Sequence, residues 1–100
     1  INYYITIDID GFDPSIAPGT GTPSHGGFLY YEVLEIIQAL AKRSQGNIVG
    51  MDLVEVAPVY DPSGMTSILA AQLLLNSIGF IFHERAQARH AMSETTTATA

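Results

Sequence analysis

Two aspartates near the start of the chain, Asp8 and Asp10, are the residues best suited to chemistry. They lie two residues apart at the end of an alternating apolar stretch, which predicts a β-strand over residues 2–10. Side chains two apart in a strand point the same way, with Cα atoms about 6.6 Å apart. Two carboxylates that close repel each other unless a cation lies between them. The spacing therefore favours a site for a divalent metal ion or a pair of them.

Two other interpretations apply to the same pair of aspartates. The interpretation without a functional role is a solvated strand end, or a turn in which an Asp side chain hydrogen-bonds to the nearby backbone. A calcium loop of the helix–loop–helix kind is excluded, because it needs an acid or amide at Phe12, glycine at Asp13 and glutamate at Gly19. The metal site and the simple turn both stay open at this point.

Residues 11–28 predict a long irregular loop, since they hold three of the five prolines and five of the nine glycines. A long loop in a small domain is usually functional. Asp13, before Pro14, is expected to brace the loop rather than bind a metal. His25 could contact a substrate, although a solvated loop histidine is the commoner outcome, so its role stays open.

The rest of the chain predicts a helix over residues 29–45, a strand over 47–56 and a helix over 65–84. The second strand is nearly apolar on both faces, which is typical of a strand covered on both sides in a parallel sheet. The second helix is apolar almost all round, so we expect it to be largely buried. Residues 86–100 lack periodicity and predict a disordered tail.

The order of strand, helix, strand and helix predicts an α/β fold with a parallel sheet and a right-handed crossover. Ligands of such folds bind beyond the carboxyl ends of the strands. Asp8, Asp10 and Glu55, which ends the second strand, should therefore face one crevice. Two strands cannot form a stable sheet alone, so strands outside this sequence should complete it. Asp52 lies within a buried strand and needs a polar partner, but its role stays open.

Composition excludes several kinds of function. The 100 residues carry ten acids against four Lys and Arg, a net charge of -6, so no basic patch exists for nucleic acid. There is no cysteine, which excludes disulfides, thiolate metal sites and a cysteine nucleophile. The longest apolar run, around residues 68–82, is interrupted by polar residues and is too short for a spanning helix, so no membrane partner is expected. No signal peptide is visible, and we expect a cytoplasmic location.

Two motifs resemble those of a known family. Residues 8–14, 17–23 and 26–27 read DIDGFDP, APGTGTP and GG, and they resemble the signature of the ureohydrolases, the arginase and agmatinase superfamily. Residues 54–58, VEVAP, resemble the second signature of that family. The resemblance covers about residues 2–84, and the form of the loop is closer to agmatinase-type members than to arginases proper.

The resemblance implies a three-layer, parallel-sheet arginase-like fold, of which this chain supplies a C-terminal β-α-β-α portion, with residues 1–85 inside the ureohydrolase domain. It implies a binuclear manganese centre (two Mn²⁺ per full active site), with Asp8 and Asp10 as metal ligands and Asp8 bridging both ions. Glu55 matches the glutamate that faces the substrate guanidinium. The family's other ligands and its catalytic histidine have no match here, so no catalytic residue is assigned within this chain.

The chemistry of these residues agrees with the implied reaction. Carboxylate oxygens suit a hard cation such as Mn²⁺ or Mg²⁺. A guanidinium carbon is a poor electrophile and needs hydroxide, which a pair of metal ions about 3.5–4 Å apart can supply from a bridging water. A fixed carboxylate such as Glu55 would pair with the planar guanidinium and orient it.

The implied activity is that of an agmatinase-type amidinohydrolase, which converts a small guanidino substrate such as agmatine to urea and putrescine in polyamine metabolism. One alternative is a guanidino-acid hydrolase of the same family, similar to guanidinobutyrase. Another is a non-catalytic truncated or assembly chain that lacks the N-terminal metal ligands. Members usually form trimers or hexamers, so a homo-oligomer is expected.

Overall fold

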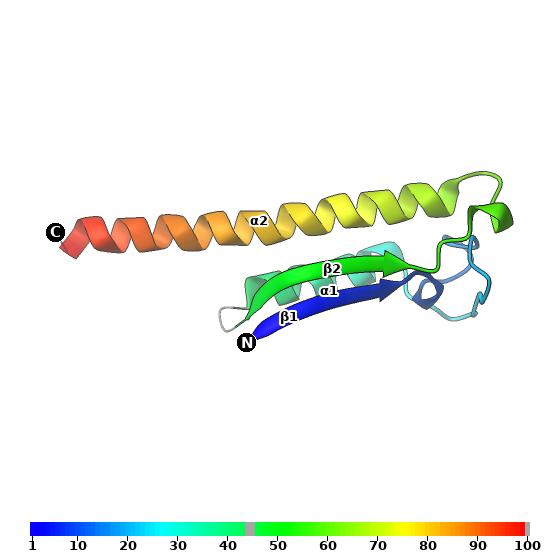
Figure 1. The fold of residues 1–100 in the computed structure, drawn as a ribbon, viewed down its shortest axis with the longest axis horizontal. Coiled ribbons are helices and arrows are strands. Elements are labelled where there is room, and N and C mark those ends of the chain that lie inside the picture. The colour runs from blue at the N-terminus through cyan, green and yellow to red at the C-terminus, as the bar shows by residue number, and fades with distance from the viewer. Residues whose placement is uncertain (44–45, 100) are drawn as a thin grey trace.

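The computed structural model of the chain describes residues 1–43 and 46–99 (Figure 1). Its elements are, in order, β1 (Asn2–Asp8), η1 (Ile9–Gly11), α1 (Tyr30–Lys42), β2 (Asn47–Val54), η2 (Pro58–Tyr60) and α2 (Met65–Thr99). The two η elements are single turns of 3-10 helix that follow the two strands. The predicted order of strand, helix, strand and helix is therefore confirmed.

The two strands pair in parallel, as the crossover through α1 requires. Thr6 lies opposite Asp52, and Asp8 lies opposite Val54. The carboxyl ends of both strands consequently meet at one edge of the sheet, and the loops that follow them gather at that end of the molecule (Figure 1).

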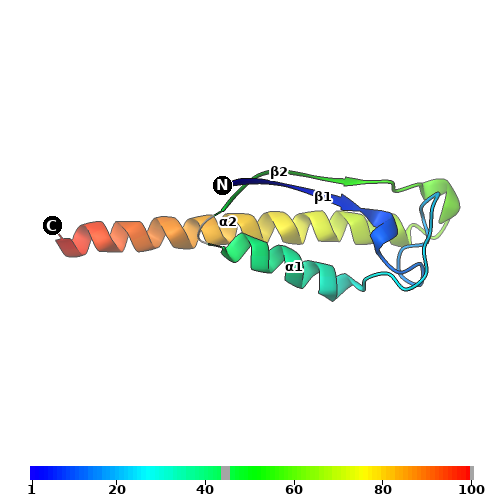
Figure 2. The ribbon, with the colours of Figure 1, turned by 90° about the horizontal axis from the view of Figure 1, so that it is seen from below.

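Both helices lie against the same face of the sheet (Figure 2). The core forms between that face and the helices, and its buried members are Ile7, Ile9, Phe12, Ala17, Ile37, Leu69, Ala70 and Leu73. The opposite face of β1 exposes Tyr4 and Thr6. The described residues thus form a two-stranded sheet with helices on one face, which is consistent with the β-α-β-α portion of an arginase-like fold that the sequence predicted.

Helix α1 begins and ends close to its predicted bounds. The Glu32 side chain accepts a hydrogen bond from the Leu29 backbone N–H at 2.7 Å, which satisfies a donor at the start of the helix. The helix ends at Lys42, and the Arg43 N–H then bonds the Leu40 carbonyl at 3.2 Å. The last residues of the predicted span, 44 and 45, lie outside the described residues.

Helix α2 is longer than predicted, because it continues from Met65 to Thr99 through residues for which a disordered tail was expected. Residues 84–89 read ERAQAR, a run of strong helix formers that needs no apolar periodicity to stay helical. His90 and Glu94 also lie one turn apart, with 2.9 Å between Nε2 and Oε1. Residue 100 lies outside the described residues.

The prediction that α2 is largely buried is wrong for the part of the molecule that the structure describes. Leu73 and Ser77 are fully buried, whereas Leu75 is 70% exposed and Phe82 is 59% exposed. Only one side of the helix packs against α1 and β2, which leaves the other side uncovered.

The extension of α2 bears on the prediction that no segment is long enough to span a membrane. From Met65 to Glu94 the helix is long and apolar enough to cross a membrane by length and composition, and 28% of its most apolar window is buried. The sequence analysis judged this run too short. The same length and composition occur in the core helix of a soluble α/β domain, and here Leu69, Ala70 and Leu73 join the core.

Candidate active site

The carboxyl end of β1 differs from the prediction in one respect. The strand ends at Asp8, and Asp10 lies in the 3-10 turn η1 rather than on the strand. The Asp8 Oδ1 atom accepts a hydrogen bond from the Asp10 backbone N–H at 3.0 Å, which turns the chain after the strand. The turn that was one of the two interpretations of this pair is therefore present, with Asp8 exposed and Asp10 half-buried.

Asp10 is held by a residue to which the sequence analysis gave no role. The Thr22 hydroxyl donates a hydrogen bond to Asp10 Oδ2 at 2.6 Å, across twelve residues of the loop. The only sequence signal was the position of Thr22 inside the Gly- and Pro-rich motif. The bond fixes one carboxylate oxygen of Asp10 and connects the loop to the strand end.

Asp13 braces the loop, as the sequence predicted. Its carboxylate accepts hydrogen bonds from the Ser15 N–H at 3.0 Å, from the Ser15 hydroxyl and from the Gly26 N–H at 3.1 Å. The hydroxyl and backbone bonds from Ser15 lower the pKa of Asp13 from its usual value. Phe28 closes the loop by donating its N–H to the Gly11 carbonyl at 2.9 Å.

The contact between the two ends of the loop requires a glycine at position 27. A Cβ atom there would lie 2.5 Å from the carbonyl carbon of Phe12, a separation that forces the backbone apart. Gly27 is thus required by close approach of two backbone segments.

Glu55 follows β2 directly and adopts an unusual backbone conformation. Its φ is 72°, and within residues 1–43 and 46–99 it is the one residue other than glycine with a positive φ. A glutamate in the left-handed region costs about 1–2 kcal/mol, and such strain is common at functional sites. Two residues later, the Ala57 N–H donates to the Gly19 carbonyl at 2.7 Å and ties this segment to the loop.

Asp52 has the polar partners that its position in the strand demanded. The Thr6 hydroxyl donates to Asp52 Oδ1 at 2.6 Å, and the Tyr4 hydroxyl donates to Oδ2 at 3.1 Å. The bond to Asp52 raises the pKa of Tyr4. All three side chains lie on the sheet face opposite the helices, so Asp52 braces that face.

The donor set at the strand end fits a hard cation but is small. Asp8 and Asp10 supply carboxylate oxygens, the ligands that Mn²⁺ and Mg²⁺ prefer. Across the described residues neither aspartate forms an ion pair with Lys or Arg. The same residues contain no group of three or more His, Asp or Glu side chains able to hold a metal ion. The metal site therefore stays a prediction.

A cavity of about 390 Å³ lies beside Asp10. Asp10, His25 and Glu32 line it together with small residues of the loop. His25 is exposed at this cavity. Its predicted contact with substrate stays a prediction.

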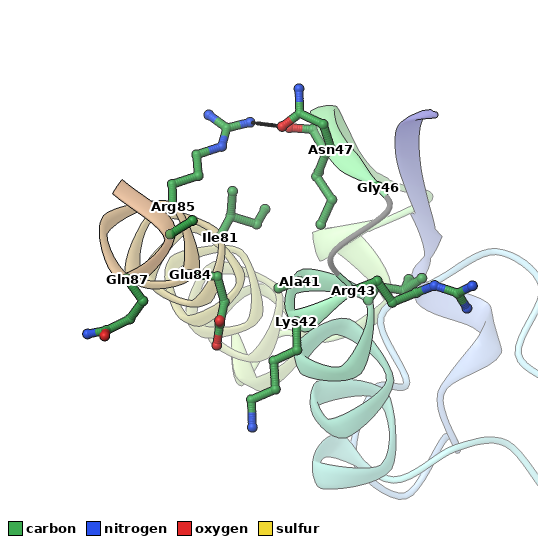
Figure 3. A pocket seen from close by; sticks show the side chains of 12 residues that line it. Ala41, Lys42, Arg43, Gly46, Asn47, Ile81, Glu84, Arg85 and Gln87 are labelled. Carbon is green, nitrogen blue, oxygen red and sulfur yellow. Dashed lines mark hydrogen bonds between the residues drawn. The ribbon is translucent and has the colours of Figure 1, made fainter. Parts of the chain in front are cut away.

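A larger cavity, of about 450 Å³, lies at the other end of the sheet, between the end of α1, the start of β2 and the middle of α2 (Figure 3). Its charged side chains do not converge. Arg43 and Arg85 point in different directions, and Arg85 donates a hydrogen bond to Asn47 Oδ1 at 3.2 Å. The acidic carboxyl end of the sheet is therefore the better candidate for chemistry.

Comparison with known proteins gives one consistent family. The family model described as "Arginase family" matches residues 1–79. An agmatinase of Halalkalibacterium halodurans is 55% identical over 73 residues, which are 73% of this chain and 25% of the relative. A guanidinobutyrase of Pseudomonas aeruginosa is 51% identical over 72 residues, 71% of this chain and 21% of the relative.

The fold agrees with that of solved structures. The crystal structure of a hypothetical agmatinase from Burkholderia thailandensis superposes with a TM-score of 0.75 at 41% identity, covering 87% of this chain and 26% of that one. The chain spans about a quarter of the length of the relatives it matches.

Proposed function

Because the chain belongs to the arginase family, we propose that the complete protein is an amidinohydrolase that releases urea from a guanidino compound. One observation carries the proposal: the matched residues 1–79 contain Asp8, Asp10 and Glu55, and the parallel register brings both strand ends to one edge of the sheet. Acidic side chains at that edge suit a cationic substrate and divalent metal ions.

Agmatine is the proposed substrate, with putrescine and urea as products. A guanidino acid is the second candidate, because the agmatinase and the guanidinobutyrase match this chain almost equally, at 55% and 51% identity. The two substrates share the guanidinium group and differ in the group at their other end. Because relatives of both kinds match residues 1–79 at nearly equal identity, we infer that these residues contact the guanidinium group that the two substrates share.

Asp8 and Asp10 are the residues that would hold manganese ions, since both are oxygen donors at the strand end. When bound, a pair of divalent ions supplies hydroxide at neutral pH by lowering the pKa of water. Thr22 prepares Asp10 for this role, because its hydrogen bond at 2.6 Å limits the rotation of the carboxylate.

Glu55 would bind and orient the substrate. Its carboxylate can accept two parallel hydrogen bonds from a guanidinium group, a geometry that fixes the plane of the group. Orientation of this kind contributes to rate because a small displacement of the reacting atoms is costly. The backbone held at φ 72° sets the direction in which this side chain leaves the chain.

The test measures urea released by the complete protein with Mn²⁺ supplied, from agmatine and from a series of guanidino acids. Asp8→Asn and Asp10→Asn should each lower kcat/KM by more than about 100-fold and weaken Mn²⁺ binding measured by calorimetry. Glu35→Gln is the matched control, because it also removes one carboxylate but lies exposed on α1. Absence of urea from every substrate would contradict the proposal and favour the non-catalytic alternative.

Assembly, expected from the resemblance, and location, expected from the sequence, both stay predictions. We propose a cytoplasmic homo-oligomer, a trimer or a hexamer. Light scattering on the complete protein would measure its mass, and a monomer at working concentration would contradict the prediction.

A further inference from the structure

The centre of the loop between β1 and α1 is fixed at Gly19, where both the backbone N–H and the backbone carbonyl form hydrogen bonds to distant residues. The Gly19 N–H donates to the Thr66 hydroxyl at 2.9 Å, and the Gly19 carbonyl accepts from the Ala57 N–H at 2.7 Å. One residue of the loop is thereby bonded to the segment after β2 and to the first turn of α2. Both partners lie more than 35 residues away in the sequence.

Thr66 is itself held in one orientation by Asp61. The Thr66 N–H and the Thr66 hydroxyl both donate to Asp61 Oδ2, each at 2.7 Å. Because that hydroxyl has a single hydrogen, which points at Asp61, it faces Gly19 with a lone pair. Thr66 is fully buried and Asp61 is 7% exposed, so water does not readily replace these bonds.

Asp61 keeps its charge in this position. The Ser63 hydroxyl donates to its Oδ1 at 2.5 Å, and the Thr66 hydroxyl and N–H bond its other oxygen. These bonds lower the pKa of Asp61 to about 2. The carboxylate is therefore an acceptor at neutral pH, which holds the hydrogen of the Thr66 hydroxyl toward Asp61 and leaves an oxygen lone pair facing the Gly19 N–H.

The contact at Gly19 has no spare room. A Cβ atom at this position would lie 2.9 Å from Thr66 Cβ and Oγ1 and 3.0 Å from Asp61 Cβ. The loop backbone thus rests directly on these two side chains, and a shift of either would displace it.

The fixed residue is close in sequence to the groups proposed to act. Thr22, which holds Asp10, follows Gly19 by three residues. Glu55, with its positive φ, precedes Ala57 by two residues. The bond between Gly19 and Ala57 therefore links the segment that carries Thr22 to the segment that carries Glu55.

We propose that Thr66 and Asp61 are positioning residues that set the placement of Glu55 relative to Asp10 through Gly19. The inference rests on the proposed function, since it concerns the same site. It adds two residues that contact neither of the proposed metal ligands nor Glu55, and that act through the backbone of the loop and of the segment after β2.

The experiment compares Thr66→Val with Thr66→Ser in the complete protein. Valine keeps the shape and removes the hydroxyl, whereas serine keeps the hydroxyl and removes a methyl group. Thr66→Val should lower kcat for urea release by about 10- to 100-fold with KM changed by less than about threefold, because a displaced group loses rate before affinity. Thr66→Ser should retain kcat within about threefold of the wild type.

Hydrogen exchange at the Gly19 amide supplies a readout that needs no activity. Loss of the Thr66 hydroxyl should raise its exchange rate by at least about tenfold, and serine should restore the protection. Unfolding midpoints of both variants establish that they fold. Equal kcat for Thr66→Val and the wild type would overturn the inference, as would equal losses in the Val and Ser variants.

The two proposals fail in distinguishable ways. Wild-type protein that releases no urea from any guanidino substrate would overturn the proposed function. An active wild type with an equally active Thr66→Val variant would overturn only the positioning role of Thr66 and Asp61.

Discussion

The strained backbone at Glu55 predicts that function and stability oppose each other at this position. A φ of 72° costs a residue with a Cβ atom about 1–2 kcal/mol relative to glycine. Replacement by glycine removes that cost but adds about 0.4–1 kcal/mol of chain entropy in the unfolded state. Taking the middle of each range, Glu55→Gly should be about 1 kcal/mol more stable than Glu55→Ala, which loses the same carboxylate and keeps the strain.

The assay is denaturant unfolding of both variants in the complete protein, together with urea release. A difference of about 1 kcal/mol changes the ratio of folded to unfolded protein about fivefold, which a shift of the midpoint resolves. Both variants should lose at least about 100-fold in kcat/KM, because neither can orient the guanidinium. Glu55→Gln, which keeps length and shape, is the control for loss of the charge alone.

Two results would refute this reasoning. Equal stability of the Gly and Ala variants would mean that the conformation at position 55 stores no strain. Retention of urea release by Glu55→Gly would mean that this carboxylate does not hold the substrate, whatever its conformation.

Two further predictions concern the loop and its buried anchor. Gly19→Ala should destabilise the protein by about 1–3 kcal/mol, because the added Cβ would lie 2.9 Å from Thr66. Gly21→Ala is the control and should not destabilise it, because its Cβ would lie 4.0 Å from the nearest neighbour. Thermal unfolding of the two variants measures the difference. Asp61 has a pKa of about 2 against a usual 3.8, so its contribution to stability is present above about pH 4 and is lost as the pH falls through 2. The free energy of unfolding should therefore fall more steeply between pH 5 and pH 2 for the wild type than for Asp61→Asn. Identical pH profiles of the two proteins would contradict this prediction.

The sequence predicted the order and the approximate bounds of the main elements because their apolar periodicity is strong. It placed Asp10 on the strand, since periodicity cannot register that the Asp8 side chain captures the Asp10 N–H and ends the strand. It also treated the end of the chain as a disordered tail. Helix propensity carries α2 through that segment, and residues 86–89, which are all exposed, are the clearest instance.

The site was predictable only in its charged members. Asp8, Asp10 and Glu55 carry a chemical signal in their types and motifs. The pairs that fix them do not, because the bond between Gly19 and Thr66 joins residues 47 positions apart and the bond from Thr22 to Asp10 spans 12. Sequence spacing gives no register for contacts between loops, so neither pair could be derived before the fold was known.

The loop after β1 is attached at its two ends, where Phe12 and Phe28 pair, at Gly19, at Thr22 through Asp10 and at Gly26 through Asp13. Residues 23–25, between the attachments at Thr22 and Gly26, are all exposed, and Ser24 and His25 line the cavity beside Asp10. Insertions or exchanges in this short span would reshape the rim above the aspartates while the attachments hold the strand end unchanged. Substrate preference is therefore expected to diversify here with little effect on stability, and a library confined to these three positions is where selection for new guanidino substrates should begin.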